Sequence, residues 1–182
     1  MKQTKIQDGV WTIDNFLTTK ECREWITFSE GKGYELAKVG TGRRQIINTT
    51  VRNNDRILYD DAELASDYYR RAFPYLVTEL SISEVSGFNE RFRFYRYTPG
   101  QRFRQHQDGS YIRNINEWSE FTFLIYLNDD FIGGATKFLH SEVHPKAGSA
   151  LLFKHERIHE GCVITKGTKY VLRTDVMYRR KG

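Results

Sequence analysis

The chain has 182 residues, 39% of them hydrophobic and 28% charged, a composition that fits one globular domain with a sizeable core. It starts without the apolar stretch of a signal peptide and contains no run long enough to span a membrane, so we expect a cytoplasmic protein. Lysine and arginine outnumber aspartate and glutamate by 28 to 23, which permits an anionic substrate and gives only weak support to a nucleic-acid partner.

Cys22 and Cys162 have no metal-type or redox spacing, so we expect reduced packing residues. Nothing in the sequence indicates an oligomeric state.

Two amphipathic helices are predicted in the first half of the chain. The run Thr18-Thr19-Lys20-Glu21 has capping-box spacing, and the helix it opens should end near Gly31-Lys32-Gly33. A second helix should begin at Asp60 or Asp61 and end before Pro74. We predict a single domain over 1–182, in which 1–87 provides helical support and a lid region.

The lid is expected around the segment Gly40-Thr41-Gly42-Arg43-Arg44-Gln45 and the turn signal Asn53-Asn54-Asp55 that follows it. Such a segment can close over a substrate, although a plain surface loop is an equally good interpretation. Four arginines of this region are weak candidates for substrate contacts, with a solvated surface as the simpler alternative: Arg43, Arg44, Arg52 and Arg56.

From Arg91 onward β-strands dominate, and Gly-marked turns separate them. The expected strands are Phe92 to Tyr97, Phe121 to Leu127, Thr136 to Leu139, Ala150 to Phe153 and Tyr170 to Tyr178. Short strands in this pattern predict a mainly β fold, a double-stranded β-helix (jelly roll, cupin-like) over 88–180 with flanking N-terminal α-helices.

The strongest chemical signal is His106-Gln107-Asp108 followed by His159. Two imidazoles and one carboxylate are the ligand set that holds ferrous iron on one side and leaves the other positions open. Residues two apart on an extended segment point to the same side, so His106 and Asp108 can reach one ion. This pattern predicts a metal-dependent oxygenase.

Beyond His159, a Gly-containing turn leads into a β-rich run. Lys169, Val171 and Arg173 alternate onto one face of that run, where a cation could bind the distal carboxylate of a dicarboxylic co-substrate. Lys169 and Arg173 compete for this role, since only arginine can hold a carboxylate in a bidentate fork. We favour Lys169, with Arg173 as a second cation or a substrate contact.

Several motifs together resemble the 2-oxoglutarate- and Fe(II)-dependent dioxygenases, most closely the stand-alone prolyl 4-hydroxylase-like members. Tyr97-Thr98-Pro99-Gly100 is similar to the family's Tyr-x-Pro-Gly element, and Gly133-Gly134-Ala135-Thr136-Lys137-Phe138 to its Gly-Gly-x-Thr-x-Phe strand. Ile125-Tyr126-Leu127-Asn128 resembles the strand whose tyrosine hydrogen-bonds the co-substrate. The resemblance implies that Tyr97, Tyr126 and Thr136 contribute to the co-substrate site.

By the same resemblance His159 is the distal metal ligand, and Lys169, ten residues on, binds the C5 carboxylate of 2-oxoglutarate. Three other histidines lie between the proposed ligands, and each could in principle replace His159: His140, His144 and His155. We expect His155 to be a solvated histidine in a hairpin turn and His144 to be a turn residue before Pro145.

The chemistry implied by the resemblance uses Fe(II), 2-oxoglutarate and O2, with ascorbate as a reductant. It releases succinate and CO2 and hydroxylates an unactivated C–H bond of a peptidyl or free amino acid or another small molecule. Asp108 argues against halogenation, because resembling halogenases lack this carboxylate. Phe103, Arg104, Tyr111 and Trp118 lie near the ligands in sequence and are candidates for the substrate pocket.

Two alternatives stay open at this point. Arg173 and Arg179, six residues apart, are similar to the C-terminal signature of nucleic-acid demethylases, although Asp175 and Met177 depart from it. Binding of alkylated nucleic acid would favour that function. The other alternative is a non-enzymatic jelly-roll module that keeps a metal for structure or sensing.

Overall fold

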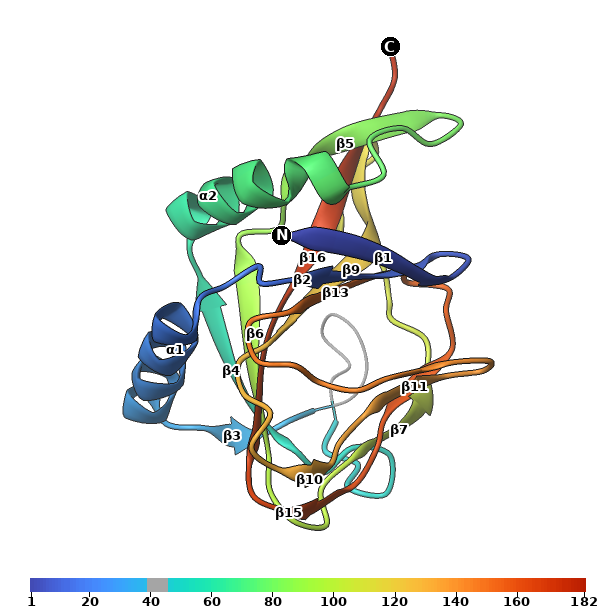
Figure 1. The fold of residues 1–182 in the computed structure, drawn as a ribbon. Coiled ribbons are helices and arrows are strands. Elements are labelled where there is room, and N and C mark those ends of the chain that lie inside the picture. The colour runs from blue at the N-terminus through green and yellow to red at the C-terminus, as the bar shows by residue number, and fades with distance from the viewer. Residues whose placement is uncertain (39–45) are drawn as a thin grey trace.

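A computed structural model describes residues 1–38 and 46–182, and Figure 1 shows its arrangement. The described chain forms two main antiparallel sheets, which confirms the predicted double-stranded β-helix. The major, ten-stranded sheet has the order β1 (Lys2–Gln7), β2 (Val10–Asp14), β13 (Ala150–Lys154), β9 (Glu117–Tyr126), β16 (Lys169–Arg180), β6 (Arg91–Tyr97), β4 (Asp55–Asp60) and β3 (Glu35–Leu36), with β5 (Ser83–Phe88) beside β16 and β8 (Ile112–Asn114) beside β9.

The minor sheet is shorter and carries part of the functional site. Its order is β12 (Glu142–Val143), β11 (Thr136–Phe138), β14 (His159–Gly161) and β7 (Phe103–His106). A separate two-stranded pair joins β10 (Ile132–Gly133) to β15 (Ile164–Lys166). Apolar side chains from both main sheets form one core cluster between them, which includes Tyr126, Phe138, Leu151 and Phe153.

Both predicted helices are confirmed and pack beside the major sheet (Figure 1). Helix α1 (Thr19–Lys32) begins with the expected capping box between Thr18 and Glu21, and Gly33 caps its end. Helix α2 (Ala62–Ala72) has Asp61 as its N-cap and runs into a 3-10 turn, Phe73–Tyr75. A larger core cluster joins the helices to the sheet.

Strict alternation along the central strands separates this core from the functional face. On β6, Phe92 and Phe94 are fully buried in the helix-side cluster, whereas Tyr95 and Tyr97 line the pocket on the opposite face. Successive residues of a strand point to opposite faces, so one short sequence serves both the core and the pocket. Strand β16 follows the same rule, with Leu172 in the helix-side core between Val171 and Arg173.

The first 87 residues contribute more than helical support, because strands β1 to β4 and all but the last residue of β5 come from them. These strands were not predicted. Strand β1 is almost wholly exposed and β4 is only half-buried, so neither shows a strong apolar alternation. The predicted lid segment 40–45, with Arg43 and Arg44, lies outside the described residues. No helix of the described chain is long and apolar enough to cross a membrane.

Candidate metal centre

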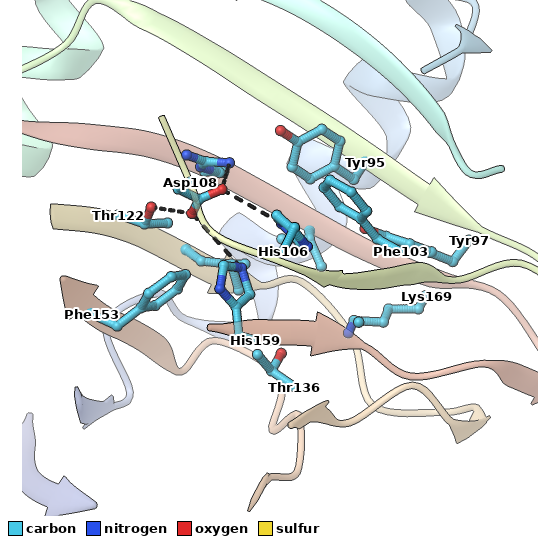
Figure 2. A pocket seen from close by; sticks show the side chains of 14 residues that line it. Tyr95, Tyr97, Phe103, His106, Asp108, Thr122, Thr136, Phe153, His159 and Lys169 are labelled. Carbon is cyan, nitrogen blue, oxygen red and sulfur yellow. Dashed lines mark hydrogen bonds and ion pairs between the residues drawn. The ribbon is translucent and has the colours of Figure 1, made fainter. Parts of the chain in front are cut away.

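The pairing of β7 with β14 brings three predicted ligands together. His106, the last residue of β7, lies directly opposite His159, the first of β14, and Asp108 follows two residues later. One donor atom from each side chain lies within 4.8 Å of the others, and Figure 2 shows the three side chains pointing toward one another. The Nε2 atoms of His106 and His159 lie 3.6 and 3.8 Å from the two Asp108 oxygens. This group can hold one divalent ion.

Both imidazoles are oriented by backbone carbonyls. His106 Nδ1 donates to the carbonyl of Arg104 at 2.7 Å, and His159 Nδ1 donates to that of Arg157 at 2.8 Å. The second nitrogen of each ring is therefore free to act as a ligand. Burial lowers the pKa of His159 to about 4, so its ring is neutral near pH 7, as metal ligation requires. His106 also stacks on Phe103, with 3.5 Å between ring centroids.

Asp108 is ionised and held at both oxygens. Arg173 donates to Oδ1 at 2.9 Å, and the Thr122 hydroxyl donates to Oδ2 at 2.6 Å. Burial alone would raise the pKa of Asp108, but the Arg173 guanidinium and the two nearby imidazoles hold this pKa well below its usual range. The carboxylate is thus ready to bind a cation without losing a proton.

Lys169 lies on the major sheet and lines the same pocket as the three ligands. Its side chain is only 4% exposed, and its ammonium donates to the carbonyl oxygen of Gly134. Burial lowers the pKa of Lys169 to about 7. No carboxylate in residues 1–38 or 46–182 forms an ion pair with it. A buried cation of this kind fits the carboxylate of a bound ligand.

Arg173 is engaged elsewhere. Besides Asp108, it bonds Asp175 at 3.1 Å, so two buried carboxylates already share its guanidinium. Of the other predicted co-substrate residues, Tyr97 and Thr136 line the pocket, as Figure 2 shows. Tyr126 is fully buried behind it and shares a 2.7 Å hydrogen bond with Thr136.

The expectation of a solvated His155 was wrong. His155 does lie in a turn, but its side chain is 4% exposed and its two ring nitrogens contact the hydroxyls of Ser119 and Thr122. Sequence reasoning missed this because the two hydroxyls come from a strand more than thirty residues earlier. His140 and His144 are exposed and lie outside the ligand group.

The solvated-surface interpretation was also wrong for Arg52. Its guanidinium lies 4.4 Å from the ring centroids of both Tyr95 and Phe103, and the residue is 4% exposed. Arg56 is half-buried on β4. Of the four substrate-pocket candidates, Phe103 lines the pocket that contains the ligand group, whereas Arg104, Tyr111 and Trp118 do not.

The Gly133-Gly134 step has a steric reason. Gly134 has a φ of +68°, and a Cβ built there would lie 2.3 Å from Ile164 Cδ1 and 3.2 Å from Lys169 Cδ. We expect Gly134→Ala to lower the free energy of unfolding by about 2–4 kcal/mol, from left-handed backbone strain and overpacking together. Gly100→Ala is the matched control, since Gly100 has a φ of +85° and nothing within 4 Å. Equal losses in urea unfolding would contradict the steric part.

Comparisons with known proteins agree with this geometry. The model of the 2OG-Fe(II) oxygenase superfamily matches residues 92–174, a span that contains the ligand group and both pocket cations. An inferred prolyl 4-hydroxylase of Acanthamoeba polyphaga mimivirus is 24% identical over 88% of this chain and 71% of its own length.

Two solved structures share the fold. A viral collagen prolyl hydroxylase of Paramecium bursaria Chlorella virus-1, in complex with 2OG, has a TM-score of 0.68 and 20% identity, covering 94% of this chain and 96% of its own. A Trichoplax adhaerens prolyl hydroxylase has a TM-score of 0.71 and 17% identity, covering 93% and 84%. The chain therefore has the fold of the prolyl hydroxylases, and its residues 92–174 are similar to the 2OG-Fe(II) oxygenase superfamily.

Proposed function

We propose that the enzyme hydroxylates an unactivated C–H bond of a peptidyl or free amino acid, or of another small molecule. The observation that carries the proposal is that the ligand group faces the same pocket as Lys169, which has no carboxylate partner in the part of the chain that the structure describes. Two imidazoles and a carboxylate suit Fe(II), and a buried ammonium suits the C5 carboxylate of 2-oxoglutarate. Bound there, iron and 2-oxoglutarate supply oxygen activation, with release of succinate and CO2.

The chain's own residues orient and shield this chemistry. His106, Asp108 and His159 would hold iron, and Lys169 would hold the far end of 2-oxoglutarate, beside the hydrogen-bonded pair Tyr126 and Thr136. Aromatic and aliphatic side chains around the pocket exclude water: Tyr95, Tyr97, Phe103, Leu124, Phe153 and Val171. A peptide substrate is supported by likeness to the Trichoplax prolyl hydroxylase, which was solved with a peptide fragment of a hypoxia inducible factor.

The nucleic-acid demethylase alternative finds less support. It depends on Arg173 and Arg179 acting together, yet Arg173 is bonded to Asp108 and Asp175 whereas Arg179 is exposed toward the end of β16.

Anaerobic titration of the metal-free protein with Fe(II) and 2-oxoglutarate tests the proposal. We expect the weak visible charge-transfer band of the bidentate iron–keto-acid chelate in the wild type and its loss in His106→Ala and His159→Ala. His140→Ala, which removes an exposed histidine outside the ligand group, is the matched control and should keep the band. A folded wild type without the band would overturn the proposal in favour of a non-enzymatic binding module.

A further inference from the structure

A continuous chain of hydrogen bonds leads from the Tyr111 backbone to the carboxylate of Asp108. The Tyr111 backbone N–H donates to Ser119 Oγ at 2.8 Å, and Ser119 Oγ lies 2.9 Å from His155 Nε2. On the other side of the ring, His155 Nδ1 lies 3.1 Å from Thr122 Oγ1, which donates to Asp108 Oδ2. Ser119, Thr122 and His155 are all buried.

The hydrogen-bonding capacity of each group indicates the direction of the bonds in this chain. Ionised Asp108 can only accept, so the single hydrogen of the Thr122 hydroxyl goes to the carboxylate. Thr122 must then accept from His155, which places the imidazole hydrogen on Nδ1. In a neutral imidazole with its hydrogen on Nδ1, the other nitrogen, Nε2, is bare and accepts the hydroxyl hydrogen of Ser119.

His155 also holds the Asp108 backbone. The Asp108 N–H donates to the His155 carbonyl at 3.2 Å, and the His155 N–H donates to the carbonyl of Glu120 at 3.0 Å. Main chain and side chain of the predicted metal ligand are therefore both tied to one residue, which belongs to the turn after β13 and is not itself in the ligand group.

We propose that His155 is a positioning residue for the metal centre, acting through Thr122 to aim the Asp108 carboxylate. Without the imidazole donor, the Thr122 hydroxyl can rotate and give its hydrogen to another acceptor. Asp108 Oδ2 then loses its fixed partner, while Arg173 still holds Oδ1. The inference rests on the proposed function, since it takes Asp108 as an iron ligand.

The test measures binding of Fe(II) alone to the full metal-free chain by anaerobic calorimetry. Loss of an outer partner of a metal ligand typically costs 10- to 100-fold in affinity, so His155→Gln is expected to raise the Kd for Fe(II) by about that factor. The Gln amide can reach toward Ser119 but leaves Thr122 without its donor. His155→Asn carries an amide N–H close to the position of Nδ1 and should rescue most of the affinity.

A double-mutant cycle separates positioning from a general structural effect. Thr122→Val, which is similar in shape to threonine, should weaken Fe(II) binding as His155→Gln does. The double variant should bind no more than about twofold more weakly than Thr122→Val alone, because both changes break one chain. Fully additive losses, or wild-type affinity in His155→Gln, would overturn the inference. His144→Gln, an exposed histidine, is the matched control.

Two further readouts protect the conclusion. The metal-free wild type should show the Nδ1–H tautomer of His155 in 15N NMR spectra, and an Nε2–H tautomer would contradict the proposed direction. If His155→Gln fails to fold, the Kd values of His155→Asn and Thr122→Val for Fe(II) still test the inference. Absence of Fe(II) binding to the wild type would instead defeat the proposed function itself, so the two failures are distinguishable.

Discussion

Replacing Asp108 with alanine is expected to abolish succinate formation and to weaken Fe(II) binding by more than about 100-fold. Loss of an outer partner of a metal ligand typically costs about 10- to 100-fold in affinity. Asp108 would be a direct ligand, so its loss should weaken Fe(II) binding by more than that. The same change leaves Arg173 with Asp175 as its remaining carboxylate partner and Thr122 without an acceptor. Breaking a buried ion pair should also lower the free energy of unfolding, by about 3 kcal/mol.

Asp108→Ala is expected to lose both stability and metal binding. The control variant must therefore lose stability but keep metal binding. Asp175→Asn removes another buried carboxylate that pairs with Arg173 and also with Arg93, but Asp175 is not in the ligand group. We expect this variant to be destabilised in urea unfolding and to retain Fe(II) binding. Near wild-type succinate formation in folded Asp108→Ala would refute the ligand assignment.

The parts of the site that could be predicted from sequence depend on the chemistry of individual side chains. The grouping of His106, Asp108 and His159 could be expected because few residue types suit iron and because their spacing suits paired strands. Lys169 was recognisable as a cation on the strand face that Val171 shares. The helix starts at Thr18 and Asp61 were predictable for a similar reason, since a cap needs only local partners.

What could not be predicted depends on partners far away in sequence. Strand β2 pairs with β13, so that Ile13 lies opposite Ala150, and no pattern within β2 specifies that partner. Arg52 is buried only because Phe103 and Tyr95 come together around it. His155 has the sequence context of a surface turn, and its burial follows from hydroxyls on β9. Each of these features depends on contacts between residues far apart in sequence, which local patterns do not specify.

The choice between Lys169 and Arg173 also required the structure, because both point into the same pocket. Two carboxylates near Arg173 leave its charge compensated. Among residues 1–38 and 46–182, the Lys169 ammonium has only the Gly134 carbonyl and the rings of Tyr97 and Tyr126 around it. The uncompensated cation is the one that gains most from a carboxylate ligand. This argument supports Lys169 as the anchor of 2-oxoglutarate.

Lys169→Met is expected to change stability and ligand affinity in opposite directions. The pKa of Lys169 is about 7 in the folded protein and 10.5 in the unfolded chain. Between these pH values the unfolded chain binds more protons than the folded protein. The buried lysine therefore lowers the free energy of unfolding most below pH 7. Methionine should therefore raise the free energy of unfolding of the ligand-free protein at pH 7. It should also raise the KM for 2-oxoglutarate by about 10- to 100-fold, because one hydrogen bond to a charged group is lost.

The same pKa predicts how 2-oxoglutarate binding depends on pH. Above pH 7 the free enzyme holds neutral Lys169, whereas the carboxylate complex needs the ammonium, so binding takes up a proton. The Kd should then rise by up to about tenfold per pH unit between pH 7 and 9. His159, with a pKa of about 4, and Tyr97, with a pKa of about 12, do not titrate in this range.

Anaerobic titrations with 2-oxoglutarate from pH 7 to 9 check this dependence. Lys169→Arg keeps a permanent charge and should flatten the curve, and Lys137→Ala, which removes an exposed lysine of β11, should leave it unchanged. An unaltered KM in Lys169→Met, together with a large increase in Arg173→Ala, would move the anchor to Arg173. A purely structural cation would stabilise the free protein. Its removal would then not raise the free energy of unfolding while also weakening 2-oxoglutarate binding.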